Sequence, residues 1–128
     1  MINYLSEWLN KADSDLNVAK ILIEKEMHLE IIAFHCQQAT EKYLKALLVY
    51  KNLKIPKTHD LDALFLLCVE EEAALKRIDR IKLSALTDFA VEYRYPVVSS
   101  PPETSEIKSY LELAQEIGNI IKDIVSEK

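Results

Sequence analysis

Glycine is almost absent from this 128-residue chain, which contains only Gly118. Folds built from many β-strands need frequent turn residues, so this scarcity argues against an all-β fold. Three of the four prolines lie close together, at positions 96, 101 and 102, and leave long stretches without a helix breaker. With 49% hydrophobic and 29% charged residues, the composition is that of a folded globular chain. The sequence predicts one all-α domain over residues 1–128.

Positive charge is also scarce, since 16 Lys and Arg residues stand against 21 Asp and Glu residues and give a net charge of −5. Coating a nucleic acid needs clustered positive charge, so binding over the whole surface is excluded, while a local basic patch stays open. The two cysteines, Cys36 and Cys68, lack metal-ligand spacing and are expected to be buried, reduced thiols. We find neither a signal-peptide pattern nor a membrane-spanning apolar run, which favours a cytoplasmic protein without membrane contact.

Apolar residues recur at steps of three and four along most of the chain, which is the pattern of amphipathic helices. We expect helices over roughly residues 3–26, 29–52 and 78–94, a shorter one that ends near residue 72, and a last one after the prolines. The second is apolar around most of its circumference, which indicates a central helix with several neighbours. Short links between long helices predict an antiparallel up-and-down bundle of four to five helices. Gly118 falls inside the last helix, where a close helix crossing would explain it.

Standard catalytic signatures are missing from the sequence. It has no glycine-rich phosphate loop, no His-Glu-x-x-His and no serine flanked by glycines. The three histidines, His28, His35 and His59, have no metal-site partner at helical spacing. We therefore predict no metal and no cofactor, and look for chemistry in two less standard segments and in the central helix.

The first candidate segment is KTHDL, residues 57–61. Thr58 is expected to be the N-cap of the third helix, with Asp60 and Asp62 in its first turn, where carboxylates favour the helix dipole. Helix N-termini bind anions readily, and Lys57 adds positive charge beside His59. Two interpretations stay open: an anion site, or a plain capped helix start in which His59 bonds locally.

The second candidate segment surrounds Arg94, which stands on the last turn before the helix stop at Pro96. Its guanidinium could satisfy helix-end carbonyls. It could equally present itself to a phosphate, with Tyr93 or Tyr95 as a stacking surface. The residues alone do not separate these two roles.

Polar residues in the apolar central helix form a third group of candidates. Gln37 is either a core amide bonded to a neighbouring helix or a residue that lines a pocket or an interface. Glu41 and Lys45 lie close to the same helix face, and their spacing of four permits an ion pair. They could frame the same cleft as Gln37 or decorate a packed surface.

Three segments together resemble motifs of the HEPN domain family. Residues 34–48, FHCQQATEKYLKALL, resemble its second helix, residues 57–61 its histidine-containing turn, and residues 94–96, RYP, its Arg-Tyr-Pro. The resemblance covers nearly the whole chain. It implies a bundle of four or five helices that commonly dimerises and is often encoded beside a minimal nucleotidyltransferase, in some cases as a toxin–antitoxin pair. It also implies that many members are metal-independent RNases, with an arginine followed four to six residues later by a histidine at the dimer interface.

This chain departs from that RNase motif, because no histidine follows Arg94. The first hypothesis is therefore a homodimeric module that binds a nucleotide or RNA and works with a nucleotidyltransferase. Its ligand-binding residues would be Lys57, His59, Asp60, Gln37, Glu41, Lys45, Arg94 and Tyr95. The second hypothesis is an RNase that acts alone, with Arg94 stabilising the phosphate and His59 as acid or base, provided that folding brings the two together. The third is a helical adaptor without a ligand.

Overall fold

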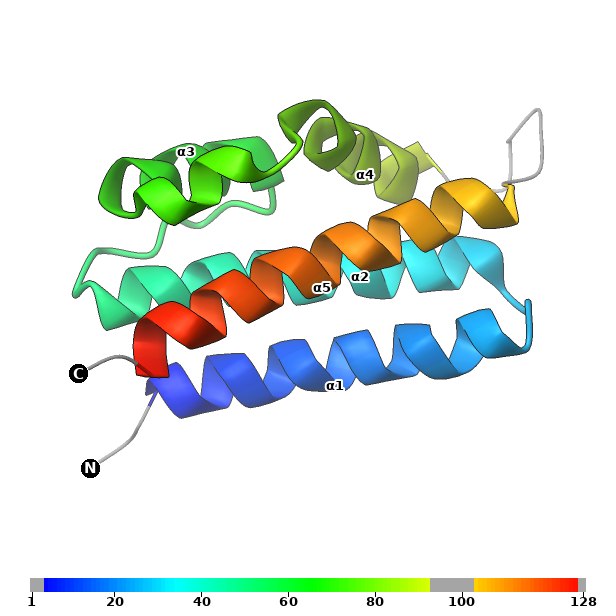
Figure 1. The fold of residues 1–128 in the computed structure, drawn as a ribbon, viewed down its shortest axis with the longest axis horizontal. Coiled ribbons are helices and arrows are strands. Elements are labelled where there is room, and N and C mark those ends of the chain that lie inside the picture. Colours follow the sequence, from blue (N-terminus) through cyan, green and yellow to red (C-terminus); the bar gives the residue numbers. More distant parts are fainter. Residues whose placement is uncertain (1–3, 93–102, 127–128) are drawn as a thin grey trace.

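The computed structural model describes residues 4–92 and 103–126, and these residues are almost entirely helical (Figure 1). The elements in chain order are α1 (Tyr4–Glu24), α2 (Leu29–Tyr50), α3 (Leu61–Glu71), the 3-10 helix η1 (Ala73–Arg77), α4 (Arg80–Glu92) and α5 (Thr104–Ser126). Within these ranges no segment forms a β-strand. The expected all-α bundle is confirmed.

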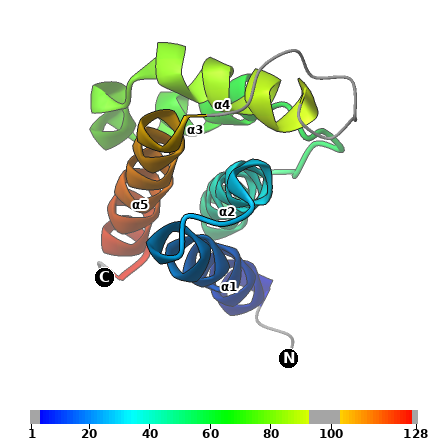
Figure 2. The same ribbon diagram turned by 90° about the vertical axis from the view of Figure 1, so that its right-hand side faces the viewer.

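The three long helices run side by side, with α1 antiparallel to α2 and α5 following the direction of α2 (Figure 1). Seen along the bundle, α3 and α4 lie over the side formed by α2 and α5, opposite α1 (Figure 2). The central helix is α2, which contacts α1, α3, α4 and α5. None of the helices that the structure describes has the length and apolar character to cross a membrane.

The core is centred on α2 and explains why this helix is apolar around most of its circumference. Its fully buried side chains include Ile32, Tyr43, Leu44 and Leu47, which belong to one core cluster with residues of α1, α3, η1, α4 and α5. Burying each large apolar side chain contributes roughly 1.5–3 kcal/mol to folding. Both thiols lie in this core, where burial raises the pKa of Cys36 and of Cys68 to about 12, so they stay protonated at neutral pH.

The start of the third helix differs from the sequence expectation. Asp60, not Thr58, is the N-cap of α3, and its carboxylate accepts a hydrogen bond from the backbone N–H of Asp62 at 3.0 Å. The Thr58 hydroxyl instead accepts from the backbone N–H of Asp60 at 3.1 Å. The helix begins later because residues 56–60 form a turn, in which the N–H of Thr58 donates to the carbonyl of Pro56.

The fourth helix also begins later than expected, at Arg80. The carboxylate of Asp79 accepts from the backbone N–H of Lys82 at 3.1 Å, and this bond fixes the helix start. The preceding residues form η1 instead, which the sequence pattern did not predict. Ile78 ends η1 in an extended conformation and is buried in the core.

Gly118 marks a close crossing of α5 and α2, as the sequence suggested. A Cβ atom at this position would lie 2.7 Å from Cε2 and 2.8 Å from Cζ of Tyr43. The Tyr43 ring is fully buried and its hydroxyl donates to Asp13 on α1. Only glycine leaves room for this ring, which explains a residue that otherwise costs about 1 kcal/mol of helix propensity.

Candidate functional site

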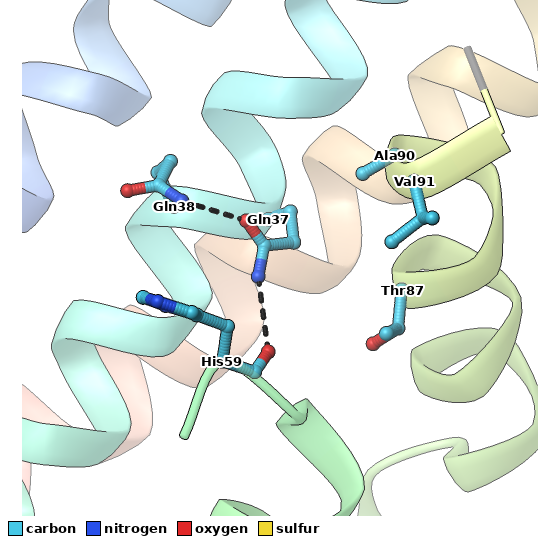
Figure 3. Close-up of a pocket in the computed structure, with 6 residues that line it drawn as sticks. All are labelled: Gln37, Gln38, His59, Thr87, Ala90 and Val91. Atoms are coloured by element: carbon cyan, nitrogen blue, oxygen red, sulfur yellow. Dashed lines mark hydrogen bonds between the residues drawn. The ribbon is translucent and has the colours of Figure 1, made fainter. Parts of the chain in front are cut away.

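A pocket of about 150 Å³ lies between α2, the turn before α3, and α4 (Figure 3). Its lining combines polar and apolar groups: Gln37, Gln38, His59, Thr87, Ala90 and Val91. Drug-sized pockets measure about 300–1,000 Å³, so this one suits a single chemical group of a larger ligand. Gln37 and Gln38 lie on one side of the pocket and the α4 residues on the other, while the His59 ring points away from α4 and its backbone carbonyl lies toward Gln37 (Figure 3).

A buried carboxylate organises the polar side of this pocket. The Glu41 side chain is 6% exposed, and one of its oxygens accepts from the ammonium of Lys45 at 2.9 Å. The other accepts from the amide of Gln37 at 3.3 Å. The ion pair expected from the spacing of four on α2 is therefore present and buried. The two charges compensate each other where water does not reach them.

His59 joins this cluster from a distant part of the chain. Its Nδ1 atom lies 3.2 Å from each carboxylate oxygen of Glu41. The Gln37 amide also donates to the backbone carbonyl of His59 at 3.3 Å (Figure 3). A carboxylate at Nδ1 favours the tautomer with the proton on that nitrogen, which leaves Nε2 as the free position of the neutral ring. Because the His59 side chain is 84% exposed, Nε2 is open to a ligand.

Four of the candidate site residues thus come together, namely Gln37, Glu41, Lys45 and His59. Gln37 combines the two interpretations left open by the sequence, since it is buried, bonded to a neighbouring segment and part of a pocket lining. His59 contacts a residue of α2 and not a neighbour in the chain. The interpretation of this segment as a plain capped helix start, in which His59 bonds locally, is therefore incomplete.

Two other candidates, Asp60 and Lys57, lie near His59 in the chain and form no hydrogen bond or ion pair with the side chains of the cluster. Asp60 is exposed and its carboxylate caps α3, as described above. Lys57 is exposed in the turn before α3, where an ammonium can approach a ligand of the pocket from solvent. Arg94 and Tyr95, with Tyr93 and Pro96, fall outside the described residues. Their roles, and the approach of Arg94 to His59, stay predictions.

Sequence reasoning missed Gln38, whose amide donates to the oxygen of Gln37 at 2.9 Å and which lines the pocket. It also missed a polar group between α1 and α2, in which Asp15 accepts from Lys42 and lies 2.9 Å from Nδ1 of His35. Gln38 and Lys42 both belong to the segment of residues 34–48, which resembles a family motif. That resemblance is the feature of the sequence that could have pointed to them. Within residues 4–92 and 103–126, no three His, Cys, Asp or Glu side chains gather as a metal site would require.

Comparisons with known proteins agree with this architecture. The family model described as "HEPN domain" matches residues 5–124. A protein of Methanocaldococcus jannaschii named "Putative toxin MJ1304" is 28% identical over 141 aligned positions, which cover 99% of this chain and 91% of that protein. The crystal structure described as "ST0689, an archaeal HEPN homologue" superposes with a TM-score of 0.68 at 19% identity, over 97% of this chain and 99% of the other. At that identity the superposition speaks for the fold alone.

Proposed function

The chain belongs to the HEPN domain family, and from this premise we propose that it is a nucleotide- or RNA-binding module that acts as a homodimer. The observation that carries the proposal is the exposed imidazole of His59 held against the buried carboxylate of Glu41 beside a pocket. A fixed polar group at the edge of a small pocket is the usual form of a ligand site.

The chemistry of the pocket suits a phosphorylated ligand. A protonated His59 and the second amide N–H of Gln38 are donors, and Lys57 adds a nearby ammonium. Phosphate oxygens only accept hydrogen bonds, so they match such a lining. The apolar side chains of Ala90 and Val91 on the other wall give a base or sugar a surface to pack against.

The biological context that we propose is a toxin–antitoxin-like pair with a minimal nucleotidyltransferase. The similarity to the protein named "Putative toxin MJ1304" supports the first part, and the family resemblance of the sequence supports the second. In such a pair the nucleotidyltransferase supplies the metal-dependent chemistry, while this chain supplies binding. Joint purification of the two proteins, with the mass of the complex measured in solution, tests both the partner and the homodimer.

Replacing His59 with alanine is expected to weaken binding of a single-stranded RNA about tenfold, because one charge-assisted hydrogen bond to phosphate is lost. Isothermal titration calorimetry measures the affinity. The matched control is His28→Asn, since His28 is exposed on another part of the chain and its positive φ tolerates asparagine. Equal affinities of both variants and the original chain would count against the proposed site.

One observation favours a metal-independent RNase as a second candidate function. The contact between Glu41 and Nδ1 orients the His59 ring and leaves Nε2 free. A histidine that acts as a general acid or base needs such an orientation. This function predicts RNA cleavage in EDTA with a bell-shaped pH profile, reduced at least a hundredfold in His59→Ala and in Arg94→Ala. The binding module instead predicts no cleavage by the purified chain, so one gel assay separates the two.

A further inference from the structure

A second hollow, of about 300 Å³, lies between the first half of α1 and the middle of α2. It is lined by Tyr4, Glu7, Trp8, Lys11 and Lys42. Two aromatic rings and two ammonium groups thus surround one space of ligand size. None of these residues belongs to the His59 pocket, so this hollow needs its own explanation.

The two hollows lie next to each other along α2. Gln38 lines the His59 pocket and Lys42 lines the Trp8 hollow. These residues are four positions apart in one helix, which places their side chains about one turn apart on the same face. Both are partly exposed, and together they form a polar strip between the two hollows.

A chain of contacts also joins the hollows beneath the surface. The ammonium of Lys45 lies 5.7 Å from the centre of the Trp8 ring. The same ammonium pairs with Glu41, whose carboxylate contacts His59. The Trp8 ring therefore contacts the same buried ion pair that contacts His59.

We propose that the Trp8 hollow is a second nucleotide subsite, so that the ligand is a single-stranded oligonucleotide whose neighbouring nucleotides occupy the Trp8 hollow and the His59 pocket. The inference rests on the proposed function and narrows its ligand from any nucleotide to a strand. A base stacks on Trp8 or Tyr4, and its phosphate meets Lys11 and Lys42. Such pairing of aromatic rings with cations is how single-stranded nucleic acids are held.

The charged residues that line the Trp8 hollow are compatible with binding of a phosphate group of a nucleic-acid strand. None of the described carboxylates forms an ion pair with Lys11. Lys42 pairs with Asp15, but an ammonium has three N–H donors and keeps others for a phosphate. Glu7 is the opposing charge at the rim. The positive charge is confined to one small site, so it is compatible with a chain whose net charge is −5.

Trp8 is the only tryptophan in the chain, so its fluorescence reports on this hollow alone. We expect an oligouridylate of about ten nucleotides to quench the Trp8 emission and to bind at least tenfold more tightly than uridine monophosphate, because a strand fills both subsites. Inorganic phosphate is the probe for charge without a base and is expected to leave the emission unchanged. Single-stranded DNA of matched sequence shows whether the affinity depends on the sugar.

Lys11→Gln is expected to weaken oligouridylate binding about threefold to tenfold and to reduce its salt dependence, since one phosphate contact is lost. The matched control is Lys20→Gln, an exposed lysine on the opposite face of the same helix, which should bind as the original chain does. Glu7→Gln is expected to strengthen binding. All three positions are exposed, so the fold is preserved.

The outcomes separate this inference from the proposed function. In one outcome, calorimetry shows binding that depends on His59, while Trp8 is not quenched and Lys11→Gln has no effect. That combination would overturn the Trp8 subsite and leave the His59 site standing. Quenching with the same affinity in His59→Ala as in the original chain would support the Trp8 subsite and overturn the His59 site. Absence of binding by any of the probes would overturn both.

Discussion

Replacing Lys45 with methionine is expected to lower the free energy of unfolding by about 3 kcal/mol. The methionine keeps the length of the apolar stem, so the main change is the loss of the ammonium that pairs with Glu41. The Glu41 carboxylate then stays buried without its cation, and removing one member of a buried pair is far more costly than removing both. Urea denaturation followed by circular dichroism measures the change.

Two further variants make this prediction specific to burial. The double variant Glu41→Gln/Lys45→Met should be more stable than Lys45→Met alone, because no unpaired charge remains in the core. The exposed pair of Arg77 and Glu116, which are 67% and 45% exposed, provides the surface control. Arg77→Met should cost less than about 1 kcal/mol. A Lys45→Met variant as stable as Arg77→Met would show that the buried Glu41 carboxylate does not depend on the Lys45 ammonium.

Replacing Gly118 with leucine is the second change with a large expected effect, again about 3 kcal/mol of lost stability. The new side chain enters the space of the Tyr43 ring, which is fully buried and hydrogen-bonded to Asp13. Either α5 moves away from α2 or the ring leaves its position, and both disrupt the core. Urea denaturation again gives the difference in free energy.

The sign of a smaller change at the same position tests the reason. Gly118→Ala alone should destabilise the chain, although alanine is better than glycine in a helix by about 1 kcal/mol. In a Tyr43→Leu background the ring is gone, and the same substitution should stabilise by about that amount. If Gly118→Ala stabilises both backgrounds equally, the close approach to Tyr43 is not what requires glycine.

The candidate site was only partly predictable from the sequence. Glu41 and Lys45 could be paired because their spacing of four is a property of any helix. His59 could be named as a candidate, but not its partner, since 18 positions separate it from Glu41. The Trp8 hollow escaped sequence reasoning for the same reason, because Trp8 and Lys42 meet only when α1 packs on α2.

The helical class, the central role of α2 and the reason to look closely at Gly118 could all be inferred from the sequence alone. These follow from the order of apolar residues and from helix propensity, which act over three or four positions and need no other part of the chain. Three features required the packed structure: Asp60 caps α3, η1 precedes α4, and the His59 ring contacts the Glu41 carboxylate. Contacts of this kind depend on which helix faces meet, and that choice is made by burial of the whole core around α2.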